Sequence, residues 1–243
     1  MNRQFFWILL FVVACGRAEG SPRSPQPPLP TMPPRDVYLS EWDHLSPGTE
    51  PSEFVDESLH YAYPWLYAGE WAITRSGFAV TEAMTDQEEP LTFRRYRGDA
   101  FSPGGLLPLH YRVEAKGRSL GGARRFSGFG ELAIQVYYLD PTHYLEVLQT
   151  NDHLCLWLAD GAQPGSGNGW RLLVRLDNPT PVGDWVCLGA EVDIPKNQVT
   201  VLLDGFPLGT VKLAFLRPRP HGLTLRATGN REEWAWLSIR NLY

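Results

Sequence analysis

The chain has 243 residues, of which 43% are hydrophobic, and its 22 basic and 27 acidic side chains give a formal charge of −5 at pH 7. This length is enough for one large domain with a sizeable core. The acidic balance argues against a nucleic-acid partner, which needs a basic face, and against electrostatic binding to a membrane.

The first element is a short apolar run, residues 5–15, which ends at Cys15. It is too short to span a bilayer, which takes about 20 residues, and it fits the apolar region of a secretory signal. With small Ala14 before Cys15, it resembles the lipobox of bacterial lipoproteins, in which the cysteine is lipidated and becomes the N-terminus. The resemblance implies a signal peptide over residues 1–14 and lipidation of Cys15. The alternative is an ordinary secretory signal cleaved near Ala18 or Ala14.

The segment that follows is rich in proline. Proline favours extended polyproline II and does not fit a helix interior or a central strand. Residues 15–35 are therefore predicted to be a semi-rigid tether that holds a domain about 50 Å from a membrane. Gly16 stands where aspartate marks inner-membrane retention in enterobacterial lipoproteins. The resemblance thus implies export and an anchor in the outer membrane, on its periplasmic or cell-surface face.

Residues 36–243 are predicted to be one all-β domain. Residues 36–60 are acidic and aromatic and are expected to form an irregular lead-in with short extended pieces. Beyond them, apolar runs recur about every 8–12 residues without a helical period, which is typical of a sandwich or barrel. The predicted strands are residues 70–74, 78–80, 111–116, 132–138, 144–148, 153–158, 170–176, 185–194, 198–203, 208–213, 223–227 and 234–242.

The order of these pieces resembles the concanavalin A-like lectin/glucanase jelly roll, in its laminin-G-like and 3-keto-disaccharide-hydrolase-like branches. The resemblance covers roughly residues 60–243. It implies two antiparallel sheets packed as a jelly-roll sandwich, with a C-terminal strand that pairs near the N-terminal one, but such a fold does not determine function. The pieces that carry it are Gly69–Ile73 with Gly77, Ala133–Tyr138 followed by Tyr144–Leu148, Trp185–Val192, Val199–Gly205 with its Asp204-Gly205 hairpin turn, and Gly222-Leu223 followed by Trp236–Ile239.

One motif of the glucanases in this superfamily is present in part. Their E-x-D-x-x-E sequence places carboxylates along one strand, where alternate side chains share a face. Glu191 and Asp193 match the first two positions, but Lys196 stands at the third. Both acids are therefore interpreted as solvent-facing, and no catalytic residue is assigned. Whether the chain is an enzyme stays open, with a binding protein favoured.

No metal site or other cofactor is predicted, because the histidines form no ligand pattern and the loop aspartates form no dense cluster. Calcium stays open, since some laminin-G-like domains bind it through loop aspartates; those present here are Asp140, Asp152, Asp160 and Asp204. Cys155 and Cys187 lie inside apolar strand patterns. A disulfide between them is permitted in an oxidising compartment, with two buried free thiols as the favoured alternative.

Aromatic side chains supply the binding hypothesis, because carbohydrate sites place Trp or Tyr faces against sugar C–H surfaces. Tyr137 and Trp157 have the same out-of-core phase in neighbouring strands. Tyr144 and Trp236 are predicted to join them on the concave sheet. For each of these residues, filling the sandwich core is the alternative.

The sequence thus predicts an outer-membrane-anchored binding module without catalysis, whose partner is a carbohydrate or an envelope protein. One alternative is a sugar-acting hydrolase of the same superfamily, with carboxylates brought together from separate loops. Another is a structural cell-envelope lipoprotein. The basic clusters, residues 94–97 and 124–125, are expected to be solvated loops, with contact to anionic glycan or lipopolysaccharide as the alternative.

Overall fold

The computed structural model of the chain describes residues 37–42, 45–49, 54–56, 69–75, 77–83, 91–96, 107–122, 132–140, 142–150, 152–162, 168–177, 180–181, 183–228 and 230–243. These residues form strands and their connections, and within them no helix is long and apolar enough to cross a membrane. Cys15, the predicted signal peptide and the predicted tether lie outside the described residues.

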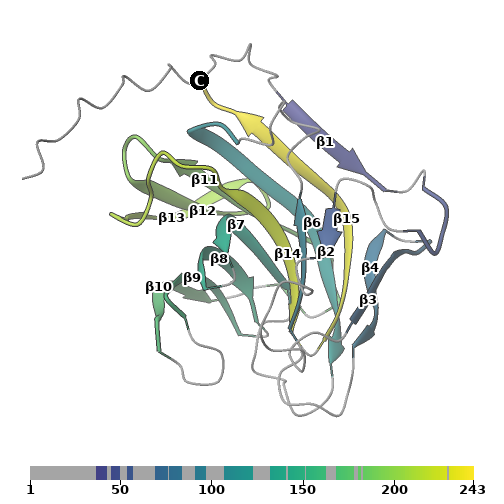
Figure 1. Cartoon of the computed structure of the whole chain (residues 1–243). Coiled ribbons are helices and arrows are strands. Elements are labelled where there is room, and N and C mark those ends of the chain that lie inside the picture. The colour runs from purple at the N-terminus through teal and green to yellow at the C-terminus, as the bar shows by residue number, and fades with distance from the viewer. Residues whose placement is uncertain are drawn as a thin grey trace, which may run out of the picture. The chain divides into compact units, whose positions relative to one another are not determined.

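Eight strands form the first sheet (Figure 1). One of them, β1 (Val37–Glu41), lies outside the linear order of the others and pairs with β15 (Asn230–Asn241), so the C-terminal strand lies next to the first described strand, as the resemblance implied. The other seven follow one another in the order β13 (Phe206–Lys212), β12 (Gln198–Leu203), β11 (Val186–Asp193), β6 (His110–Gly122), β15 (Asn230–Asn241), β4 (Phe78–Ala83) and β3 (Gly69–Ile73).

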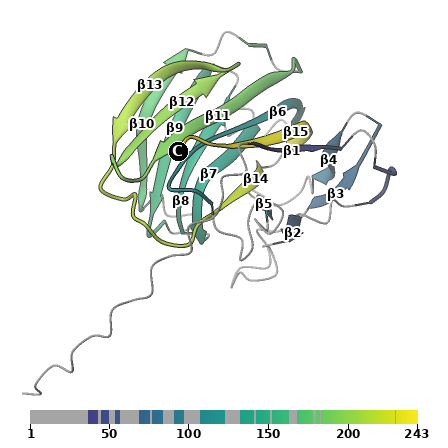
Figure 2. The ribbon, with the colours of Figure 1, turned by 90° about the horizontal axis from the view of Figure 1, so that it is seen from above.

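Seven strands form the second sheet, and every strand pair in both sheets is antiparallel. The chain passes between the sheets several times, and Figure 2 shows the strands of both from above. The prediction of an all-β, two-sheet antiparallel jelly-roll sandwich is confirmed. The order is β10 (Trp170–Asp177), β9 (His153–Asp160), β8 (His143–Gln149), β7 (Leu132–Asp140), β14 (Gly222–Thr228), β5 (Leu91–Tyr96) and β2 (Phe54–Asp56).

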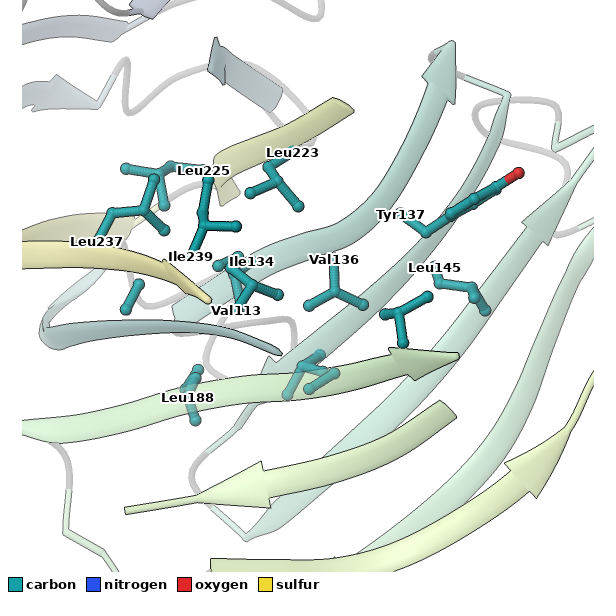
Figure 3. Close-up of a cluster of buried hydrophobic side chains, with 14 of the residues drawn as sticks. Val113, Ile134, Val136, Tyr137, Leu145, Leu188, Leu223, Leu225, Leu237 and Ile239 are labelled. Carbon is teal, nitrogen blue, oxygen red and sulfur yellow. The ribbon is translucent and has the colours of Figure 1, made fainter. Parts of the chain in front are cut away.

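The hydrophobic core lies between the two sheets. Along β6, the buried side chains of Tyr111, Val113 and Ala115 alternate with half-buried polar ones, which is the pattern of a strand with one dry face. Side chains from both sheets meet in the core (Figure 3). Those labelled there are Val113, Leu188, Leu237 and Ile239 from the first sheet, and Ile134, Val136, Tyr137, Leu145, Leu223 and Leu225 from the second.

Each strand predicted between residues 70 and 242 corresponds to a strand of the structure. The prediction was wrong for residues 94–96 of β5, because the basic cluster of residues 94–97 was expected to lie in a solvated loop. They form a strand that pairs with β14 on one side and β2 on the other. Leu91 and Phe93 alternate with Thr92 and Arg94, but Arg95 ends this short alternation, so the rest of the strand depends on pairing with distant segments.

The turn between β12 and β13 is Asp204-Gly205, as predicted. Both residues have positive φ angles, 48° and 83°, and a two-residue loop of this kind is a type I′ turn, whose twist matches that of the strands. Asp204 Oδ1 also accepts a hydrogen bond from the backbone N–H of Cys187 at 2.9 Å. The turn therefore sets the register of the hairpin at the edge of the first sheet.

Two β-bulges change which side chains face the core. In β7 the register against β8 shifts between Gln135 and Tyr137, and in β15 the register against β6 shifts between Trp234 and Trp236. A bulge adds one residue to one strand, so the side chains beyond it lie on the face opposite to the one that strict alternation gives them. As a result, Tyr137 packs in the core, whereas Trp236 lies outside it.

Cys155 and Cys187 are both free thiols. Cys155 lies on β9 of the second sheet and Cys187 on β11 of the first. Burial raises the pKa of both thiols, that of Cys187 to about 12. The structure therefore corresponds to the free-thiol alternative, and neither thiol is activated as a nucleophile.

His221 is buried between the rings of Tyr111 and Tyr137, whose centroids lie 5.6 and 4.6 Å from its own. Its Nδ1 donates a hydrogen bond to the carbonyl oxygen of Arg219 at 2.8 Å. Burial lowers the pKa of His221 to about 4, and the charge of Arg219 acts in the same direction. The imidazole is therefore neutral at pH 7 and tyrosine rings cover both its faces.

We expect this histidine to make the domain acid-sensitive. Its pKa in the folded chain is below the unfolded value of about 6.5, so the unfolded chain takes up the proton first. The stability it confers is complete above pH 6.5 and falls by about 3 kcal/mol as the pH drops to 4. Urea unfolding at pH 7 and pH 4 measures this loss, which should be smaller in His221→Phe. The same pH dependence in both proteins would contradict the assignment.

Candidate functional site

The outer face of the second sheet carries polar and aromatic side chains that alternate with the core residues of the same strands. We call this group the polar–aromatic face. It consists of Gln135 and Tyr138 on β7, Tyr144 and Glu146 on β8, Trp157 on β9, Trp170 on β10, and Thr224 and Arg226 on β14. All of them are buried except Trp157 and Trp170, which are half-buried.

Cross-strand register arranges part of this face as an aromatic row. Tyr138 lies opposite Tyr144, and Ala159 lies between Tyr144 and Trp170. The rings of Tyr144 and Trp170 meet edge to face with centroids 5.5 Å apart, and those of Tyr138 and Tyr144 lie 6.3 Å apart. Because Ala159 is small, the two larger rings can meet across its strand.

The next row is polar at one end and aromatic at the other. It runs from Thr224 through Gln135 and Glu146 to Trp157, each residue opposite the next in register. The hydroxyl of Thr224 donates a hydrogen bond to Gln135 Oε1. Trp157, which is half-buried, therefore lies directly beside a carboxylate.

A buried ion pair closes the polar end of this row. Arg226 lies one row away, opposite Ala133, and its Nε donates a hydrogen bond to Glu146 Oε1 at 2.7 Å, while its Nη2 donates to the same oxygen. Arg226 is 7% exposed and Glu146 is 1% exposed. Burial raises the pKa of the Glu146 carboxyl, and the charge of Arg226 opposes this effect. Because both side chains are buried, the charged form of each is stabilised by its partner.

Two of the four aromatic residues predicted to bind ligand, Tyr144 and Trp157, lie on the polar–aromatic face, in neighbouring rows. Tyr137 does not, because the bulge in β7 turns it into the core, where it is 0% exposed and its hydroxyl donates to the carbonyl oxygen of Arg217. The prediction that Tyr137 and Trp157 both point away from the core on neighbouring strands is therefore wrong. Tyr138, one residue further along, lies on the face instead.

Trp236 lies on the other sheet. It pairs in register with Lys116 on β6 and with Glu41 on β1, on the outer face of the first sheet. The prediction that it shares a sheet face with Tyr144 and Trp157 is wrong. The prediction failed because β15 belongs to the first sheet. The alternation of side chains along a strand does not reveal which strands lie next to it.

The partial glucanase motif lies on the first sheet. Glu191 Oε1 is 3.0 Å from His110 Nε2. Asp193 accepts hydrogen bonds from the backbone N–H of Lys196 at 3.0 Å and from its Nζ at 2.7 Å, so the residue at the third motif position is its partner. Asp193 is buried, which corrects the expectation that both acids face solvent. Asp193 therefore stabilises the turn before Lys196, and Glu191 contacts His110.

No group of three or more His, Cys, Asp or Glu side chains is arranged to hold a metal ion in the described ranges. Two of the four loop aspartates considered for calcium have hydrogen-bonding roles. Asp140 Oδ1 accepts from Thr142 and is 3.0 Å from His143 Nδ1. Asp204 stabilises the hairpin turn described above.

Sequence reasoning missed the polar part of the face, namely Gln135, Glu146, Thr224 and Arg226. A signal was present for two of them. Glu146 and Arg226 are charged residues at the outward phase of otherwise apolar strands, and a charge among apolar neighbours needs a partner. Their pairing depends on β14 lying two strands from β8, which local patterns do not contain.

No protein-family model and no curated protein sequence matches this chain. Solved structures do resemble it. The calcium-bound exoplasmic/lumenal domain of VIP36 has a TM-score of 0.57 and 10% identity, covering 86% of this chain and 93% of its own. The Crh5 transglycosylase has a TM-score of 0.55 and 11% identity, covering 87% and 89%.

The carbohydrate binding module CBM66 from Bacillus subtilis is also similar, with a TM-score of 0.50 and 12% identity, covering 72% of this chain and 92% of its own. At such identities the likeness concerns the fold alone. The chain therefore has a jelly-roll sandwich fold that resembles those of the VIP36 exoplasmic/lumenal domain, the Crh5 transglycosylase and the carbohydrate binding module CBM66.

Proposed function

We propose that this chain is a carbohydrate-binding protein whose ligand lies on the polar–aromatic face. The observation that carries the proposal is the row in which the half-buried Trp157 lies opposite Glu146, and Glu146 lies opposite Gln135. Sugars need this combination, because an aromatic ring covers their C–H surface and polar groups bind their hydroxyls.

The structural neighbours support the same proposal. One is a carbohydrate-binding module, and VIP36 is also known in a form bound to Ca²⁺ and Man3GlcNAc. Because the Crh5 transglycosylase is an enzyme with a similar fold, catalysis is the alternative to be considered. Retaining hydrolysis needs two carboxyls about 5 Å apart, whereas the described carboxylate at the centre of this face, Glu146, is paired with Arg226. Binding without catalysis is therefore the function we propose.

Trp157→Ala is expected to weaken glycan binding by at least tenfold, because it removes the aromatic surface on which the sugar stacks. The full-length chain is tested on a glycan array and by thermal shift, with and without calcium, since a ligand that binds the folded state raises the melting temperature. Trp236→Ala is the matched control, a half-buried tryptophan on the other sheet. Equal losses in both variants, or no loss in Trp157→Ala, would exclude this face.

We also propose that lipid on Cys15 anchors the domain at the outer membrane. The apolar segment of residues 5–15 and the proline-rich segment after it support this, because multiple acyl chains hold a protein firmly at a bilayer. Cys15→Ser is expected to release the protein from the membrane fraction, whereas Cys187→Ser should leave it there. Cell fractionation with immunoblotting distinguishes the two, and membrane retention of Cys15→Ser would contradict the anchor.

A further inference from the structure

The centre of the polar–aromatic face holds an unpartnered donor next to an unpartnered acceptor. Gln135 and Glu146 lie directly opposite each other in register. Gln135 Oε1 is bound by Thr224, and Glu146 Oε1 by Arg226. The second polar atom of each side chain, Gln135 Nε2 and Glu146 Oε2, is buried and makes no hydrogen bond. Gln135 acts to lower the pKa of the Glu146 carboxyl, against the larger effect of burial, and acts to lower that of Tyr144 as well, so its amide lies close to both groups.

A single hydroxyl group satisfies both atoms. An amide N–H only donates and a carboxylate oxygen only accepts, whereas a hydroxyl does both. It accepts from Gln135 Nε2 and donates to Glu146 Oε2. Buried polar atoms that lack partners are costly, so a ligand that supplies both bonds is selected by them.

An anionic group does not fit the same place. A carboxylate or sulfate has no proton to donate to Glu146 Oε2, and its charge is repelled by that carboxylate. Arg226 is the cation at this point of the face, and its charge is already neutralised by Glu146. We therefore propose that the site selects neutral glycans, with one sugar hydroxyl between Gln135 Nε2 and Glu146 Oε2, and excludes uronic-acid and sulfated glycans. This inference rests on the proposed function.

The half-buried Trp157 lies opposite Glu146 in the same row, and Gln135 follows on the far side of Glu146. A sugar stacked on the ring of Trp157 is therefore next to Glu146. Because both atoms are buried, binding requires the side chains around them to change rotamer, as is common at binding sites. The tryptophan fluorescence of the chain is expected to change on binding, and this change should be absent in Trp157→Phe.

The test measures binding of the full-length chain to neutral oligosaccharides of glucose, mannose, galactose, xylose and fructose. Each hexose-based probe is compared with its uronate or sulfated counterpart. Neutral glycans are expected to bind at least tenfold tighter. Equal or tighter binding of the anionic members would overturn this inference and leave the proposed function intact. Binding of none of the probes would overturn the proposed function, and the inference with it.

Glu146→Gln tests the same chemistry from the protein. It keeps an oxygen for Arg226, removes the negative charge at position 146, and exchanges the free acceptor for a donor. Affinity for the neutral glycan is expected to fall at least tenfold, while that for its anionic counterpart rises. Glu233→Gln is the matched control, because Glu233 is a buried acid paired with Arg118 on the first sheet. An unchanged preference in Glu146→Gln would overturn the inference.

A second measurement does not depend on the folding of that variant. O-methyl ethers of the bound neutral glycan keep the oxygen acceptor but cannot donate to a carboxylate. At least one such ether should bind the wild-type chain tenfold or more weakly. Retained affinity of every mono-methyl ether would contradict a hydroxyl held between the two atoms.

Discussion

An Arg226→Met variant is expected to lose about 3–5 kcal/mol of unfolding free energy, because it leaves a buried carboxylate without its ion-pair partner. Glu146 is 1% exposed, and one of its oxygens receives hydrogen bonds from both Nε and Nη2 of Arg226. Methionine retains an unbranched apolar side chain at this position, so the loss reports mainly on the charge. Urea unfolding of both proteins at pH 7 measures it.

Two further measurements separate the ion pair from packing. The double variant Arg226→Met with Glu146→Leu should recover most of the stability, since an apolar pair carries no desolvation penalty. The deficit of Arg226→Met should also shrink as the pH falls towards 4. Without Arg226, burial alone raises the pKa of Glu146 above its unfolded value, and the folded chain then takes up the proton more readily. A loss below about 1 kcal/mol at pH 7 would contradict a buried pair.

The strands of this domain could be predicted from local pattern. The core side chains of β6 recur at every second position, and Asp204-Gly205 is a two-residue turn with the φ angles that such sequences favour. Each of these signals is contained within a few consecutive residues. The C-terminal strand also pairs near the start of the domain, as the resemblance implied.

The face to which a side chain points could not be predicted wherever a bulge intervenes. Alternation carried through β7 places Tyr137 outside and Tyr138 inside, and the bulge before Tyr137 reverses both. A bulge depends on the register of the partner strand, which is not a local property. The same holds for the Arg226–Glu146 pair, whose members come from strands about 80 residues apart in sequence.

Which sheet a strand joins was equally inaccessible from alternation. Trp157 and Trp236 both follow apolar patterns, yet they lie on the outer faces of different sheets. Strand order results from the packing of the whole chain, so a site shared by several strands emerges only with the topology. For this reason the aromatic part of the site was predicted for Tyr144 and Trp157, and its polar part was missed.

Trp234 and Trp236 stand two residues apart in β15, and their truncation is expected to cost very different amounts of stability. Trp234 is 0% exposed and lies opposite Gly117 in register, whereas Trp236 lies beyond the bulge on the outer face. Trp234→Ala should lose about 3–5 kcal/mol of unfolding free energy, as large-to-small core changes do. Trp236→Ala should lose about 1 kcal/mol or less. Strict alternation predicts similar losses, so similar values from urea unfolding would contradict the bulge.

Gly117 provides the complementary test, because it makes room for the indole of Trp234. A Cβ atom at position 117 would lie 2.6 Å from Trp234 Cε3 and 3.0 Å from Leu132 Cδ1. Gly117→Ala is therefore expected to cost about 1–3 kcal/mol through overpacking. In the Trp234→Ala background the ring is gone, and the same alanine should cost much less or fill part of the cavity. The two changes must then be strongly non-additive, whereas simple addition would mean that the ring and the glycine are not in contact.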